Sequence, residues 1–332
     1  MINPLLEFRS RLSKYEATML DESRLLTCVI RGFVETLSIQ RPVSRSPEKR
    51  VRQVGLPAYL TLISRLSCRR AGTRFNSRGI DDDGNVANFV ETETIIWNPH
   101  SSKNQQPVEF SYCQVRGSVP IFWEQQTGFL PNQQKIQLTR SPEATQPAFD
   151  KHMEGLVLKY GSAHIVNLLS ETKSGEVDLS DRYRYHVNHS SMSVDSRGRE
   201  KRMTASLLLN TEYDFHAETR AGYEATSSLK PILEESSDAF GYFLMEDQPA
   251  EEQASTQSTV TVLQQEGVFR TNCLDCLDRT NVVQGILSRT AIESFLDHLG
   301  EVLAHEFWVQ HNTIWADNGD VCFPTHHELY SS

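Results

Sequence analysis

The sequence has 332 residues, enough for one large domain or two modest ones. Its hydrophobic content of 38% and mean hydropathy of −0.44 are ordinary for a globular protein, and no run approaches the ~20 apolar residues that span a bilayer. Six cysteines without a framework spacing fit a reducing cytosol better than a disulfide-bonded secreted protein, and the N-terminus lacks a signal-peptide pattern.

Charge is distributed unevenly along the chain. The net charge of −10 argues against a general anion binder, and we expect no nucleic-acid partner. The segment from Ile39 to Arg78 nonetheless holds ten basic residues and one acid, whereas Leu233 to Glu252 holds seven acids and no base. A basic face would hold the protein at anionic cytoplasmic leaflets by roughly 1 kcal/mol per well-placed residue. The alternative for Arg41 to Arg52 is a solvated charged loop.

The first half of the chain predicts one helix followed mainly by strands. Residues 5–40 are expected to form a helix and then a strand-like piece from Leu25 to Leu37, and residues 41–54 a loop. Residues 126–147, rich in Gln, Pro and Thr, predict a surface connection or hairpin. Between these segments, strand-like runs occupy Tyr59 to Ile63, Val86 to Trp97 and Val108 to Arg116.

The second half alternates helices and strands, which predicts an α/β fold with a mixed β-sheet flanked by helices. A phosphate loop is expected between its last strand and last helix. The predicted segments are a helix from Ala148 to Tyr160, a buried strand from Ala163 to Leu169, a polar turn from Ser170 to Gly175, irregular structure from Arg182 to Lys201, a run from Leu207 to His216 leading into a helix to about Leu233, a flexible stretch from Ala250 to Ser258, a short strand at Val268-Phe269 and a helix through His298.

The run from Arg270 to Asn281 contains Cys-x5-Arg, with Cys273 and Arg279 as its fixed points. A loop of this length can curl around a phosphate-sized anion, with its N–H groups pointing inward and the following helix adding its positive end. That environment favours a thiolate, which makes Cys273 a nucleophile. Arg279 can grip two phosphate oxygens as a bidentate fork. The hydroxyl of Thr280 can hydrogen-bond the departing sulfur.

Cys273 also forms a Cys-x2-Cys pattern with Cys276, which suggests other readings. A structural zinc site usually needs a second ligand pair, but the other cysteines are scattered singly. A redox pair would leave Arg279 and Thr280 unexplained. A further possibility is a disulfide between the two cysteines that protects Cys273 under oxidation. We expect no metal and no cofactor, because Arg279 and the loop supply the positive charge.

The run from Arg270 to Asn281 closely resembles the signature of the Sac domain phosphoinositide phosphatases. Further blocks are similar to the same family, and their amino-acid sequences are most similar to the Sac domain of fungal synaptojanin-like proteins. The resemblance runs from near residue 5 to Asp320. The supporting blocks are Arg65 to Arg78, Gly79 to Glu93, Arg116 to Gln125, Tyr213 to His216 and Trp315 to Asp320.

This resemblance implies removal of a phosphate monoester from a phosphatidylinositol phosphate, with the 4-phosphate favoured. Cys273 is expected to attack phosphorus while Arg279 stabilises the equatorial oxygens. For the general acid we prefer Asp275, which alternatively hydrogen-bonds the loop amides, and Asp278 is expected to orient Arg279. Asp317 is a weaker alternative acid. We expect substrate binding by Asn272, Leu274, Cys276 and Leu277 of the loop and by Arg116, Arg70 and Arg74.

The resemblance also predicts a division of the chain. Residues 1–54 are expected to be a remnant of the Sac N-terminal subdomain, residues 55–320 the Sac catalytic domain, and residues 321–332 a divergent tail. The competing functions are a catalytically impaired phosphoinositide-binding or scaffolding remnant and a protein tyrosine phosphatase. The second of these normally has glycine in its loop, and the run from Leu274 to Asp278 has none.

By family analogy we expect a cytoplasmic protein that contacts anionic membranes peripherally. Its expected partners are a phosphoinositide lipid substrate and proteins of membrane trafficking or endocytosis. Trp123 is expected to be a core residue, and His216 a hydrogen-bonded structural histidine rather than a catalyst.

Overall fold

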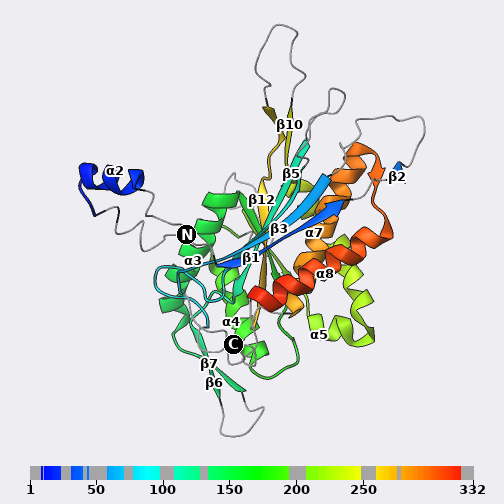
Figure 1. Cartoon of the computed structure of the whole chain (residues 1–332). Helices are drawn as coiled ribbons and strands as arrows, with labels where there is room; N and C mark the ends of the chain where they lie inside the picture. The colour runs from blue at the N-terminus through cyan, green and yellow to red at the C-terminus, as the bar shows by residue number, and fades with distance from the viewer. Residues whose placement is uncertain are drawn as a thin grey trace, which may run out of the picture.

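A mixed β-sheet with helices packed on both faces forms the centre of the molecule (Figure 1). The predicted α/β class is therefore confirmed. The computed structural model describes residues 9, 11–23, 31–39, 43–44, 58–70, 78–97, 108–127, 134–193, 207–247, 259–274 and 278–322.

The described residues include nine strands of the central sheet. They are β1 (Gly32–Ile39), β3 (Ala58–Leu66), β4 (Val90–Trp97), β5 (Val108–Ser118), β8 (Ser162–Asn167), β9 (Leu208–Glu212), β10 (Phe243–Asp247), β11 (Thr259–Leu263) and β12 (Gly267–Cys273). Their order is β1-β3-β4-β5-β12-β8-β9, and β10 pairs with both β5 and β11. The strands from β1 to β5 pair antiparallel, whereas β5, β12, β8 and β9 run parallel. The predicted strands in residues 59–63, 108–116 and 268–269 lie in this sheet, whereas those in residues 86–97 and 163–169 overlap β4 and β8, which begin at Val90 and end at Asn167.

The two regions of the sheet bury their strands differently. In β4 buried and half-buried residues alternate, as expected where the two faces of a strand differ in cover. In β8 every residue after Ser162 is buried, as expected of a parallel strand covered on both faces. Two small sheets lie outside the main one. They are the predicted hairpin of β6 (Trp123–Thr127) with β7 (Gln134–Leu138), and the pair β2 (Val43–Ser44) with β13 (Glu301–Val302).

Helices cover both faces of the parallel region. On one face lie α3 (Pro142–Tyr160) and α4 (Glu176–His189), whose apolar residues join those of β5, β8 and β12. The other face carries α6 (Leu229–Phe240), α7 (Asp278–Leu299) and α8 (His305–Cys322). The remaining elements are α2 (Lys14–Glu22), α5 (Phe215–Glu218) and the 3-10 turns Thr219–Ala221 and Tyr223–Ser228.

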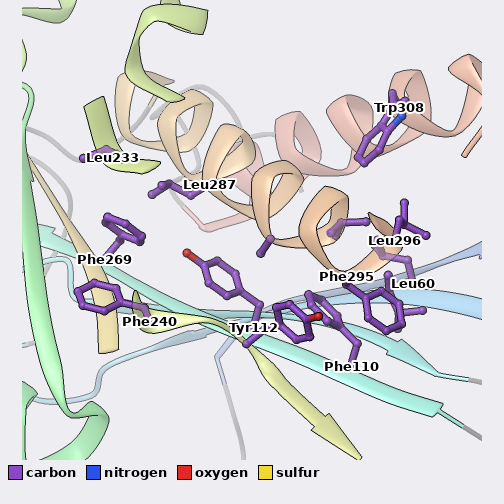
Figure 2. Close-up of a cluster of buried hydrophobic side chains, with 14 of the residues drawn as sticks. Leu60, Phe110, Tyr112, Leu233, Phe240, Phe269, Leu287, Phe295, Leu296 and Trp308 are labelled. Atoms are coloured by element: carbon purple, nitrogen blue, oxygen red, sulfur yellow. The ribbon is translucent and has the colours of Figure 1, made fainter. Parts of the chain in front are cut away.

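The core beneath α7 is aromatic (Figure 2). Phe110 of β5 packs against Phe295 of α7 with 4.9 Å between ring centroids, and Phe269 of β12 packs against Phe240 of α6 at 5.1 Å. Burial of one such ring stabilises the fold by roughly 1.5–3 kcal/mol. Because α7 is anchored this way, its first turn is held at the carboxyl end of β12.

The prediction of irregular structure from Arg182 to Lys201 is wrong for residues 182–189, which belong to α4. The helix is polar in composition, but it buries Leu179, Tyr183, His186 and Val187 on one face. Their spacing of three to four residues is helical, and packing against α3 and the sheet outweighs the low average hydrophobicity.

The predicted helix running to about Leu233 is also corrected, because the described chain forms α5 and two 3-10 turns before α6 begins at Leu229. Gly222, with φ of 123°, separates the two 3-10 turns. The predicted flexible stretch from Ala250 to Ser258 lies outside the described residues. The domain boundary at residue 54 stays a prediction, although β1 of the first part pairs along its whole length with β3.

Candidate active site

The predicted nucleophile lies at the carboxyl end of a central parallel strand. Cys273 is the last residue of β12, and its backbone is level with Ser118 of the neighbouring β5. Ligands of α/β proteins bind outside this edge of the sheet, where the loops that follow the parallel strands meet. The helix α7 begins at Asp278, so the expected strand and helix are both present on either side of the Cys-x5-Arg run, whose loop conformation stays a prediction. Asp275, Cys276 and Leu277 lie outside the described residues.

Arg279 is the second residue of α7 and is mostly buried. Its Nη1 donates to the carboxylate of Glu176, 3.3 Å away, and to the backbone carbonyl of Leu168 at 3.4 Å. Leu168 directly follows β8, which pairs with β12. The Arg279 guanidinium is thus hydrogen-bonded to residues that follow β8, and it does not project into solvent.

Glu176 is a site residue that the sequence analysis missed. It is 5% exposed, and its carboxylate also accepts a hydrogen bond of 2.7 Å from the backbone N–H of Ser170. A buried carboxylate needs a cation and hydrogen-bond donors, and Arg279 and Ser170 supply them. The available signal was position, because Glu176 follows the polar turn at the end of a buried strand.

Arg116 of β5 is fully buried beside the first turn of α7. Its Nη1 donates to Oδ1 of Asn281 at 3.3 Å, and Asn318 of α8 donates to the same oxygen at 3.0 Å. Asn281 in turn donates to the carbonyl of Trp315. This network connects β5, α7 and the block from Trp315 to Asp320, three segments that are distant in sequence.

A second buried arginine, Arg270 of β12, joins β12 to β5 and α3. Its Nη2 donates to the carbonyl of Ser118 at 2.8 Å, and its Nε donates to Nε2 of His152 at 2.9 Å. Because that nitrogen accepts, Nδ1 of His152 carries the proton and donates to the Gly84 carbonyl at 2.9 Å. Burial and the charge of Arg270 hold the pKa of His152 well below its usual range. The imidazole is therefore neutral.

The remaining predicted site residues lie at varying positions around this edge. Asn272 and Thr280 are buried, Leu274 is half-buried and packs against the core under α3, and Asp278 is exposed. Their catalytic and binding roles stay predictions. The guanidinium of Arg70 donates from Nε and Nη2 to the carbonyl of Arg78 at 3.2 and 2.6 Å. Arg74 lies outside the described residues.

Two residues expected to be structural are placed in different surroundings. Trp123 is 1% exposed and donates its indole N–H to the Val119 carbonyl, so its assignment to the core is confirmed. His216 is only half-buried and lies at the carboxyl edge of the sheet, in α5 after β9. In the described part of the chain, no cluster of three or more His, Cys, Asp or Glu side chains has an arrangement that could hold a metal ion.

Known proteins match this chain over most of its length. A family model described as the SacI homology domain matches residues 1–220. Inositol-1,4,5-trisphosphate 5-phosphatase 1 of Schizosaccharomyces pombe is 45% identical over 320 residues, which cover 96% of this chain and 26% of the relative. Polyphosphatidylinositol phosphatase INP53 of Saccharomyces cerevisiae is 40% identical over 327 residues, with the same two coverages. Human synaptojanin-1 is 38% identical over 269 residues, covering 79% of this chain and 15% of the relative.

The chain thus spans only 26% or less of the length of these three relatives. The family match nonetheless covers well over half of the chain, and it agrees with the resemblance found in the separate sequence blocks. The chain belongs to the SacI homology domain family.

Proposed function

We propose that this chain is a phosphoinositide phosphatase that removes a phosphate monoester through a phospho-cysteine intermediate. The observation that carries the proposal is the position of Cys273, at the carboxyl end of β12 and directly before the loop that leads to Arg279 and α7. The printed names of the relatives add support, because they describe an inositol trisphosphate phosphatase and a polyphosphatidylinositol phosphatase. The preferred substrate is phosphatidylinositol 4-phosphate, which rests on the family resemblance.

The proposed reaction has two steps. The Cys273 thiolate forms a bond to phosphorus as the bond from phosphorus to the ring oxygen breaks, and Asp275 gives its proton to that oxygen. Water then attacks phosphorus and gives a proton to the Asp275 carboxylate as the phosphorus–sulfur bond breaks, which releases inorganic phosphate and restores both the thiolate and the acid. Arg279 and the positive end of α7 stabilise the phosphoryl oxygens in both steps.

Peripheral contact with anionic membranes is part of the same proposal. Not all of the basic segment is available for this role, because Arg65 is paired with Glu91 and Glu93 at 3.2 and 2.6 Å. Arg69 is exposed, whereas Arg70 is half-buried and donates to the Arg78 carbonyl. Among the described residues no helix is both long and apolar enough to cross a membrane. Turnover on vesicles with and without phosphatidylserine tests the contribution of surface charge.

The central experiment measures phosphate release from short-chain phosphatidylinositol 4-phosphate in EDTA and reductant. We expect turnover by the wild type and a loss of at least about 1,000-fold in Cys273→Ser, because a serine hydroxyl ionises far less readily than a thiol. Cys113→Ser is the matched control. Burial and the nearby Glu93 raise the pKa of the Cys113 thiol to about 12, so it is not a nucleophile at neutral pH. Equal release by Cys273→Ser, or abolition by EDTA, would refute the mechanism.

A further inference from the structure

Three segments of the chain follow neighbouring parallel strands at the carboxyl edge of the sheet. They follow β12, β8 and β9, which are neighbours in the sheet. The loop after β12 leads to Arg279, the turn after β8 carries Lys173, and α5 after β9 carries His216. In Figure 1 α4 and α5, which belong to the second and third segments, both lie in the lower half of the view. These residues therefore lie at the edge of the sheet where the substrate phosphate is proposed to bind.

Lys173 and His216 form a direct contact between two of these segments. The Nζ of Lys173 lies 2.7 Å from Nε2 of His216. An ammonium group can only donate, so Nε2 accepts and the ring proton lies on Nδ1. Burial, followed by the charges of Arg279 and Lys173, lowers the pKa of His216 and keeps the ring neutral. The positive charges of Arg279 and Lys173 thus both lower the pKa of the His216 imidazole.

The nearby carboxylates are already used by other groups. Glu176 is bound to Arg279 and to the Ser170 N–H. The carboxylate of Asp214 accepts backbone N–H bonds from Glu171 at 2.8 Å and Ala217 at 3.0 Å. Within the part of the chain that the structure describes, no carboxylate forms an ion pair with Lys173. An ammonium paired only with a neutral imidazole, beside an arginine, is a suitable partner for an anion.

We propose that Lys173 and His216 form a second anion-binding site, which holds another phosphate group of the substrate beside the phosphate that is removed. Its assignment to the substrate rests on the proposed phosphatase function. Lys173 would supply the charge that binds the phosphate, and His216 would hold the ammonium group in place by accepting a hydrogen bond from it at Nε2. An inositol phospholipid has two possible sources of this second phosphate, namely the phosphodiester that joins the ring to glycerol and a further ring monoester.

The experiment compares three water-soluble substrates. Inositol 4-phosphate has one phosphate, glycerophosphoinositol 4-phosphate adds the diester, and inositol 4,5-bisphosphate adds a ring monoester. In Lys173→Gln we expect the ratio of kcat/KM for a two-phosphate substrate to kcat/KM for inositol 4-phosphate to fall about 10-fold, as for loss of one charge-assisted hydrogen bond. His216→Phe should lower the same ratio, and Lys173→Arg should restore most of it. The exposed Lys14 of α2 provides the control, since Lys14→Gln should keep the wild-type ratio.

The affected substrate identifies the source of the phosphate. A fall with glycerophosphoinositol 4-phosphate assigns the site to the diester, and a fall with inositol 4,5-bisphosphate assigns it to a ring phosphate. The proposal would be overturned if Lys173→Gln kept the wild-type ratio for both two-phosphate substrates. An equal fall of kcat/KM on all three substrates leaves the ratio unchanged and would also overturn it.

Calorimetric binding to Cys273→Ser separates this inference from the catalytic one. If the wild type shows no turnover but Lys173→Gln weakens binding of the two-phosphate ligands selectively, the second site stands and the phosphatase proposal fails. If neither ligand binds more tightly than inositol 4-phosphate, the second site is refuted.

Discussion

Several charged side chains near the carboxyl edge of the sheet are buried and hydrogen-bonded to other elements. Arg116 and Arg270 are fully buried, and each donates to a partner on another element. Glu176 is buried, and its carboxylate accepts hydrogen bonds from Arg279 and from the backbone N–H of Ser170. Such groups hold one geometry, because moving any of them leaves a charge without its partner in a poorly solvated place. The phosphate site proposed at this edge therefore lies beside groups whose geometry is held by buried hydrogen bonds.

Glu176 provides a residue-scale prediction. Glu176→Ala should lower the free energy of unfolding by roughly 3 kcal/mol, because it leaves Arg279 and the Ser170 N–H without their acceptor. Glu176→Gln should lower the free energy of unfolding by less. Its amide oxygen still accepts the hydrogen bond from the Ser170 N–H, and only the negative charge is lost. We also expect kcat/KM to fall at least about 10-fold in both variants, because Arg279 loses its anchor. Urea unfolding and kinetics measure the two effects, and wild-type values for both in Glu176→Ala would contradict this role.

At the scale of elements, caps and turns determine where the helices join the sheet. Ser141 accepts from the backbone N–H of Ala144, and Pro142 occupies the first position of α3. At the other end Gly161, with φ of 88°, turns the chain directly into β8. The connection between α3 and β8 is therefore a single residue, which places β8 in register beside β12.

Gly161 should be intolerant of substitution. Its φ is strained for other residues, and a Cβ would lie 2.2 Å from the backbone oxygen of Glu266. We expect Gly161→Ala to lower the free energy of unfolding by at least about 2 kcal/mol. Gly155→Ala in the same helix is the matched control. It has open space around its Cβ position and should raise stability by about 0.5–1 kcal/mol. Urea titrations of both variants decide the matter, and similar midpoints would exclude a special role for Gly161.

For the whole molecule, two histidines buried under the helices α6, α7 and α8 couple stability to pH. His164 bonds to Ser236 and Thr211 at 2.7 and 2.8 Å, and His311 bonds to Ser288 at 3.1 Å. Burial lowers the pKa of each to about 4, from an ordinary value of 6.5. Both imidazoles are thus neutral in the folded protein at neutral pH. They serve as hydrogen-bonding core residues rather than as catalytic groups.

Stability should therefore decline with acidity in a defined window. Between pH 6.5 and 4 the unfolded chain takes up protons at these histidines that the folded protein does not bind. Their contribution is complete above pH 6.5 and is lost as the pH falls towards 4, by up to about 1.4 kcal/mol per pH unit for each histidine. Urea unfolding from pH 7 to 4.5 measures the slope, and His311→Gln should make it shallower. An unchanged slope would show that His311 does not contribute.

The amino-acid sequence by itself determined the α/β class, the family and the order of strand, Cys-x5-Arg loop and helix, because these depend on neighbouring residues and local periodicity. Only the tertiary structure paired Arg279 with Glu176 and Lys173 with His216, since the partners follow different strands and are brought together by the parallel order of β12, β8 and β9. It also decided that residues 182–189 belong to the polar helix α4, where burial against the sheet outweighs composition.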